Sequence, residues 1–185
     1  LENLAYTPAP DIVHEAAGHA PIIADPEYSD YLRGYGEVSR KAIYSAQDLE
    51  VYDAVRNLSE VKEDPGSTPE LIERAQKQLD QAVAAVSYES EAAELARMAW
   101  WTTEYGLVGD MSSPKIYGAG LLSSVGESYN CLNREVNKIP STMDCIKTAY
   151  DIPRPPPQLF VTPDFATLTR ELEAFAGTMA FRRGG

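Results

Sequence analysis

Prolines bound the short segment that contains both of the chain's histidines, and this arrangement constrains the local fold more than any other feature of the sequence. Residues 6–11 hold Pro8 and Pro10, whose rings fix their own backbone angles and bias each preceding residue to extended geometry. That stretch is therefore predicted to be an ordered loop. A helix can follow over residues 12–20 and is expected to end near Pro21, so both imidazoles are confined to one short helix.

The rest of the chain is predicted to be mainly α with minor β. Apolar residues recur at three- and four-residue spacings in several stretches, and prolines, glycines and capping side chains separate them. Helices are expected over residues 26–38, 47–58, 70–86, 89–105 and 164–179. Extended segments are expected at 115–120, 151–157 and 158–162, with a loop at 121–124. Residues 1–185 have the length of a single domain with one core of ordinary size.

Composition and charge argue against several classes of partner. The formal net charge of −12 is unsuited to nucleic acid, which attracts clustered Lys and Arg. No apolar stretch is long enough to span a bilayer, and no basic region followed by an apolar run indicates a signal peptide. Cys131 and Cys145 lack a CxxC or Cys/His spacing, so both are expected to be reduced thiols. We expect a soluble, cytoplasmic protein without a nucleic-acid or membrane partner.

The first indication of chemistry is that the only two histidines, His14 and His19, fall in one six-residue segment that also holds Glu15. Two imidazoles and a carboxylate with open coordination positions suit Fe(II), which needs those positions for oxygen and substrate, although zinc would bind the same ligands. On a regular helix, residues five apart point about 140° away from each other. The two side chains can meet at one ion only if the helix widens or breaks locally, and Gly18 is where we expect this.

Two other interpretations of the segment stay open from the residues alone. In the first, both histidines are structural, satisfied in a core or lying on the surface, although packing does not account for their concentration beside acidic residues. The second is a zinc metallopeptidase-like hydrolase, with Glu15 as general base and Glu37 as third ligand. The HExxH motif of such enzymes places its histidines four apart, about 40° around the helix, so the spacing of five argues against it.

Three blocks of sequence add a family resemblance. Residues 6–21, Tyr-Thr-Pro-Ala-Pro-Asp-Ile-Val-His-Glu-Ala-Ala-Gly-His-Ala-Pro, include the five-residue histidine spacing. Residues 96–107 carry Glu104, and residues 115–127 contain the run Tyr-Gly-Ala-Gly-Leu-Leu-Ser-Ser. Together they resemble the pterin-dependent aromatic amino acid hydroxylases, most closely the bacterial phenylalanine 4-hydroxylases. The second block resembles that family's segment with the carboxylate ligand, and the third resembles its substrate loop.

The resemblance implies the catalytic-domain fold of that family and a non-haem Fe(II), tetrahydropterin-dependent monooxygenase that hydroxylates an aromatic amino acid. Phenylalanine to tyrosine is the implied substrate and product pair. His14, His19 and Glu104 would form a 2-His-1-carboxylate face, leaving three positions for water, oxygen and the reacting groups. The implied partners are an aromatic amino acid, molecular oxygen and a reduced pterin.

Further positions carry over from the same resemblance. The residues that match the family's substrate surroundings are Thr7, Pro10, Trp100, Gly120, Ser123 and Ser124. Glu15 and Ala96 match residues that face the pterin, and Glu127 matches a carboxylate suited to orient His14 through its free ring N–H. Each position also has a structural alternative, such as core packing for Trp100 or turn formation for the two serines.

The chain departs from the family pattern in three places. Ala99 stands where the family usually has Tyr, which removes an aromatic group near the pterin. Helical sequence over roughly residues 51–89 is an insertion relative to the better-known members, and we expect it to be structural. Family members place pterin-stacking residues and an arginine for the substrate carboxylate before the Thr-Pro loop, so we expect a catalytic-domain segment incomplete at its N-terminal side. These departures leave a third interpretation, a degenerate non-catalytic metal-binding module.

Overall fold

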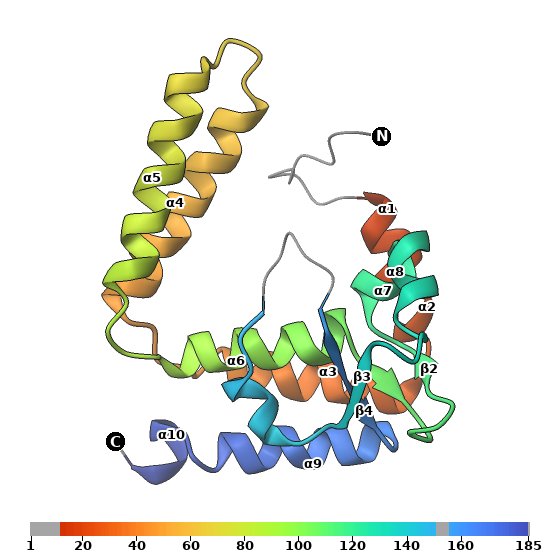
Figure 1. Cartoon of the computed structure of the whole chain (residues 1–185). Coiled ribbons are helices and arrows are strands. Elements are labelled where there is room, and N and C mark those ends of the chain that lie inside the picture. The colour runs from red at the N-terminus through yellow and green to blue at the C-terminus, as the bar shows by residue number, and fades with distance from the viewer. Residues whose placement is uncertain (1–11, 151–155, 185) are drawn as a thin grey trace.

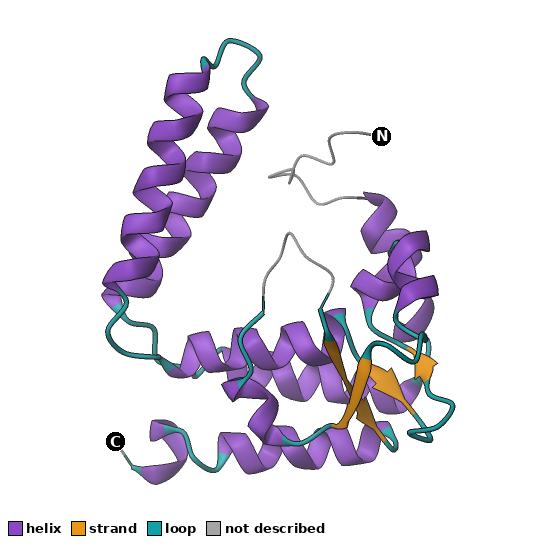
Figure 2. Cartoon of the chain, in the orientation of Figure 1, coloured by secondary structure: helices purple, strands orange, loops and turns teal. Residues whose placement is uncertain are grey.

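The computed structural model describes residues 12–150 and 156–184 of the chain. Within them, helices dominate and a small sheet lies on one side, as predicted (Figure 2). The predicted extended stretch at residues 151–157 falls mostly outside the described residues. No helix of the described part combines the length and apolar character that crossing a membrane requires. Cys131 and Cys145 are both buried and form no disulfide.

Three helices form the body of the structure: α3 (Pro26–Ser39), α6 (Glu91–Ala99) and α9 (Phe165–Ala176). Each begins at a residue whose side chain accepts hydrogen bonds from the first backbone N–H groups, namely Asp25, Ser90 and Asp164. Helix α3 packs along α9 (Figure 1), and the Tyr35 hydroxyl of α3 donates to the backbone carbonyl of Leu95 in α6.

The sheet has the strand order β2-β1-β4-β3. Strand β1 (Leu107–Val108) pairs antiparallel with β2 (Lys115–Ile116), and β4 (Gln158–Thr162) runs parallel to both β1 and β3 (Asn137–Pro140). The predicted extended segments at 115–120 and 158–162 contain β2 and β4. Strands β1 and β3 were not predicted, because two to four residues are too few to show an alternating pattern.

A cluster of buried aromatic rings occupies the core beneath the segment that carries Glu104. Tyr28, Tyr117 and Phe165 form a three-ring group with centroids 5.1–5.6 Å apart, and Trp101 lies edge-on to Phe160. Fully burying a large apolar side chain contributes roughly 1.5–3 kcal/mol. The cluster therefore stabilises the packing of the core next to the segment that carries Glu104.

Helices α4 (Ala46–Glu63) and α5 (Pro69–Ala85) form a hairpin that rises away from the body (Figure 1). They pack mainly on each other, and their buried apolar residues are Ala54, Leu58 and Ala75. The hairpin overlaps the insertion expected over residues 51–89, although α4 begins five residues earlier, at Ala46. Helix α4 extends five residues beyond the predicted end at Leu58.

The first helix differs from the prediction because it does not end at Pro21. It runs as α1 (Ile12–His14), η1 (Glu15–His19) and α2 (Ala20–Ile23), of which η1 is a π-helix. Pro21 is the second residue of α2, which follows the widened turn η1 directly. The predicted loop at 121–124 is also helical, with α7 (Ala119–Ser123) followed by α8 (Val125–Asn130).

Candidate metal centre

The π-helix η1 brings His14 and His19 together. Its hydrogen bonds join residues five apart, and the Ala20 N–H donates to the Glu15 carbonyl. Residues five apart therefore lie near the same side of the helix, whereas regular helical geometry would turn them away from each other. The two imidazole rings stand edge to face with their centroids 4.9 Å apart. The expected local widening of the helix is confirmed.

Gly18 allows α7 to approach η1. A Cβ atom at this position would lie 2.6 Å from the Ala119 carbonyl oxygen, a separation that real Cβ atoms essentially never show. Only glycine fits there without moving one of the two elements. Because α7 ends at Ser123, the close approach also brings the Ser123 hydroxyl to the ring of His14.

Glu104 is carried by a second π-helix, η2 (Trp100–Glu104), which continues α6. The Tyr105 N–H donates to the Trp100 carbonyl five residues back, at 3.0 Å. The hydroxyls of Thr102 and Thr103 both donate at 2.7 Å to carbonyls four residues earlier, a type of bond that bends helices. Both segments that carry candidate ligands are therefore widened helical turns, and π-turns of this kind occur frequently at functional sites.

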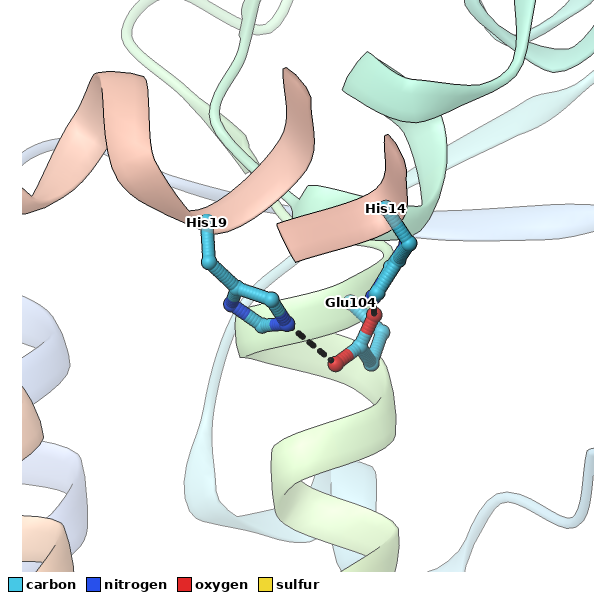
Figure 3. Close-up of side chains that lie close together, drawn as sticks. All are labelled: His14, His19 and Glu104. Carbon is cyan, nitrogen blue, oxygen red and sulfur yellow. Dashed lines mark ion pairs between the residues drawn. The ribbon is translucent and has the colours of Figure 1, made fainter. Parts of the chain in front are cut away.

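The three side chains point toward one another (Figure 3). His14 Nε2 lies 3.3 Å from Glu104 Oε2, and His19 Nε2 lies 3.3 Å from Glu104 Oε1. One candidate ligand atom from each residue can be chosen so that all three lie within 4.8 Å of one another. Ligands about 2.1 Å from a shared ion are separated by roughly 3.0–3.4 Å, so small side-chain rotations suffice to bind one ion. About a quarter of each side chain is exposed, which leaves access from solvent.

The tautomer of His14 supports metal binding. Its Nδ1 lies 2.8 Å from the Ser123 hydroxyl oxygen, and that hydroxyl donates its own proton to the Ala119 carbonyl at 2.8 Å. Ser123 therefore accepts from His14 Nδ1–H, and Nε2 is the ring nitrogen that faces Glu104. A lone pair and a carboxylate oxygen 3.3 Å apart repel each other unless a proton or a cation lies between them. The donor set thus fits a divalent cation.

The contact at His14 Nδ1 is made by Ser123 and not by Glu127, to which the sequence analysis assigned it. Glu127 lies in α8, where its backbone N–H donates to the Ser124 hydroxyl, and its side chain faces the Tyr105 hydroxyl. Burial raises the pKa of Glu127, while the Tyr105 hydrogen bond opposes that rise. Helix α7 ends at Ser123, which contacts His14, whereas Glu127 lies four residues further on, in α8.

Trp100 is the centre of an aromatic stack. Tyr105 covers one part of its ring system at 4.7 Å and 27°, and Tyr150 stacks on it at 4.3 Å and 13°. The segment before Tyr150 is held by the Trp101 indole N–H, which donates to the Thr148 carbonyl at 2.7 Å. Two tyrosine rings therefore contact the Trp100 side chain, which η2 carries together with Glu104.

The remaining predicted site residues lie in different surroundings. Gly120 lies against Glu104 and Tyr105, since a Cβ there would be 3.1 Å from the Glu104 carbonyl oxygen. Ser124 caps α8. Glu15 and Ala96 are exposed. Thr7 and Pro10 lie outside the described residues.

Glu37, the third zinc ligand of the peptidase interpretation, is not at the centre. It lies on α3, is mostly exposed and pairs with Arg40 at 2.8 Å. Glu104 completes the candidate ligand set with the two histidines instead. This placement removes the residue on which the peptidase interpretation depended.

The sequence analysis did not identify Tyr28, Tyr105 or Tyr150 as neighbours of the centre. No spacing pattern could have indicated them, because they come from α3, from the end of η2 and from the segment after η3 (Met143–Lys147). They share only a hydroxylated aromatic ring, and tyrosine is common in this chain.

Comparison with known proteins gives consistent matches. A family model described as biopterin-dependent aromatic amino acid hydroxylase matches residues 2–51 and 61–183. Phenylalanine-4-hydroxylase of Chromobacterium violaceum is 29% identical over 185 residues, covering 92% of this chain and 47% of the relative. Phenylalanine-4-hydroxylase of Dictyostelium discoideum is 27% identical over 172 residues, covering 92% of this chain and 29% of the relative. The chain thus spans less than half the length of these curated relatives.

Solved structures agree in fold. The Chromobacterium violaceum phenylalanine hydroxylase structure with bound oxidized Fe(III) aligns with a TM-score of 0.59 and 26% identity, covering 94% of this chain and 47% of that one. The apo structure of the cold-active enzyme from Colwellia psychrerythraea aligns with a TM-score of 0.57 and 24% identity, covering 97% and 54%. The family model leaves residues 52–60 of this chain unmatched, and these residues lie within α4 of the hairpin.

Proposed function

The chain belongs to the biopterin-dependent aromatic amino acid hydroxylase family, and on that premise we propose that it binds Fe(II) through His14, His19 and Glu104 as the metal-binding part of a tetrahydropterin-dependent monooxygenase. The observation that carries this proposal is the meeting of the two imidazoles and the carboxylate above a buried aromatic floor. Three protein ligands on one side of an ion leave the other positions open, which is the arrangement typical of non-haem Fe(II) oxygenases.

The chain's own residues bind, orient and shield. His14 and His19 present imidazole nitrogens to the ion, Glu104 supplies the charge that makes a divalent ion favourable, and Ser123 holds His14 in the binding tautomer. The stack of Tyr150, Trp100 and Tyr105 excludes water from one side of the centre. When bound, Fe(II) and reduced pterin supply the electrons that oxygen splitting requires.

Phenylalanine is the proposed substrate and tyrosine the proposed product. The support is that the matched relatives are phenylalanine-4-hydroxylases from bacteria, a slime mould and animals. An aromatic ring next to Trp100 also meets an aromatic wall suited to it. Molecular oxygen and a reduced pterin are the proposed co-substrates.

Titrating the purified 185-residue chain with metal tests whether the three proposed ligands bind iron. Fe(II) added without oxygen is expected to bind with one equivalent per chain, and His14→Ala, His19→Ala or Glu104→Ala should each lose that binding. Glu37→Ala is the matched control, because it removes an exposed carboxylate on α3 that pairs with Arg40 and is not part of the candidate ligand set. Equal iron occupancy in all variants would overturn the assignment.

Activity is measured with tetrahydropterin, oxygen and phenylalanine on the complete natural protein that contains this chain, because family members place pterin-stacking residues and an arginine for the substrate carboxylate before the Thr-Pro loop. Tyrosine formation and pterin oxidation that both depend on Fe(II) are the expected results. Zinc-dependent peptide cleavage would instead favour the hydrolase. Iron binding without any oxygen consumption, with phenylalanine, tyrosine or tryptophan, would favour the non-catalytic metal-binding module.

A further inference from the structure

Three buried polar side-chain atoms near the centre have no hydrogen-bond partner among the described residues. They are the hydroxyl of Tyr28, Nε1 of Trp100 and Oε2 of Glu127. Buried polar groups in folded proteins nearly always have a partner, so each such atom calls for an explanation. Tyr28 is the one of the three whose whole side chain is removed from solvent.

Packing alone does not explain the Tyr28 hydroxyl. A phenylalanine would fill the same space in the aromatic core without leaving a polar atom unpaired. The other tyrosines of α3 behave differently: Tyr31 pairs with the Thr102 hydroxyl at 2.9 Å, and Tyr35 donates to the Leu95 carbonyl at 2.9 Å. The unpaired hydroxyl is therefore specific to the position of Tyr28 and not a general property of this helix.

Tyr28 lies directly beneath the segment that carries Glu104. Its ring stands edge-on to Tyr117 with centroids 5.6 Å apart, and the hydroxyl end of Tyr117 packs against Gly106, where a Cβ would lie 2.3 Å from that oxygen. Gly106 follows Glu104 by two residues. Burial and, to a smaller extent, the negative charge of Glu104 raise the pKa of Tyr28, so its hydroxyl stays protonated and can donate.

We propose that Tyr28 is a positioning residue for Glu104, whose hydroxyl donates through one buried water to the carboxylate and holds it in the orientation that binds the metal ion. The geometry behind the proposal is the buried Tyr28 hydroxyl without a described partner, the Tyr31–Thr102 bond of 2.9 Å that joins α3 to η2, and the contact of Tyr117 with Tyr28 and Gly106. A bridging water is proposed because ordered water commonly joins polar groups that do not bond directly. The inference rests on the proposed function, because it requires Glu104 to be a metal ligand.

Two different residues would then orient two of the metal ligands. Ser123 orients His14 from the side of α7, and Tyr28 orients Glu104 from the side of α3. Removing a residue that hydrogen-bonds to a metal ligand typically weakens metal binding roughly 10- to 100-fold. A water-mediated contact is expected at the low end of that range.

The experiment compares Tyr28→Phe with Tyr35→Phe, which makes the same chemical change seven residues later on the same helix. Co(II), whose visible absorption bands report coordination geometry, is titrated into the full chain alongside anaerobic Fe(II). For Tyr28→Phe we expect about tenfold weaker binding of both ions and shifted Co(II) bands. The unfolding midpoint of the metal-free variant should change little, because the hydroxyl has no direct partner among the described residues and the ring packing is kept.

Tyr35→Phe should show the opposite pattern: a lower unfolding midpoint through loss of the bond to Leu95, with unchanged metal affinity and unchanged Co(II) bands. Wild-type metal affinity and spectrum in Tyr28→Phe would overturn the inference while leaving the proposed function intact. Failure of the wild type itself to bind either ion would overturn both, so the two failures are distinguishable.

Discussion

Replacing Ser123 with alanine tests how the protein prepares His14 for metal binding. The substitution removes the oxygen that accepts from His14 Nδ1 at 2.8 Å and with it the contact that selects the Nδ1–H tautomer. Removal of such an orienting partner typically weakens metal binding roughly 10- to 100-fold, which corresponds to about 1.4–2.8 kcal/mol. The metal-free fold should lose only about 0.5–1.5 kcal/mol, because water can reach the partly exposed imidazole.

Ser124→Ala is the matched control, since it removes the same atom from the adjacent residue. The Ser124 hydroxyl accepts from the Glu127 N–H and caps α8, so its loss should cost roughly 0.5–2 kcal/mol of stability without changing metal affinity. Both variants are compared by anaerobic Fe(II) titration and by thermal unfolding of the metal-free protein. Wild-type affinity in Ser123→Ala, or an equal loss in Ser124→Ala, would refute the reasoning that Ser123 sets the tautomer.

Three further predictions follow from particular contacts. Gly18→Ala should destabilise the protein by about 1–3 kcal/mol and weaken metal binding, because its Cβ would meet the Ala119 carbonyl at 2.6 Å and push α7 from η1; an unchanged melting curve would contradict this. Glu91→Ala should cost about 1–3 kcal/mol in denaturant unfolding, since its carboxylate accepts from the N–H groups of Ala180 and Ile43 and ties the C-terminal helix to the body. Glu127→Gln should be more stable than the wild type at pH 7. Burial raises the pKa of Glu127 in the folded state. The contribution of its protonated carboxyl to folding stability is therefore fully present below the unfolded pKa of about 4.3 and is lost as pH rises through the higher folded-state pKa. The two unfolding midpoints should therefore converge toward pH 4, and parallel curves would contradict the prediction.

The metal-binding histidine segment could be predicted from the sequence because its constraints are local. Prolines before residue 12 and at residue 21, the five-residue spacing of the only histidines and Gly18 between them all act within one short stretch. Together they required a widened helix if the side chains were to meet, and the structure contains that helix. The longer helices were also predictable, since their apolar periodicity and capping residues are properties of neighbouring positions.

Glu104 could not be selected from 28 acidic residues by local pattern, and only the family resemblance singled it out. The structure brings it to the histidines through a second π-turn, which no residue pattern predicted. The short strands β1 and β3 escaped prediction for a related reason: they exist because β4 pairs with both, not because of their own two to four residues.

The sequence by itself determined that two imidazoles would share one short helix and that a mainly helical domain would surround them. The tertiary structure decided which groups surround the site: Ser123 and not Glu127 contacts His14, Tyr150 stacks on Trp100, and the Tyr28 hydroxyl is buried without a hydrogen-bond partner in the described part of the chain. The physical reason is the range of the interactions. Helix periodicity, caps and proline effects act over a few residues, whereas a hydrogen bond or a ring contact across 50 to 110 residues depends on how the packed elements approach one another.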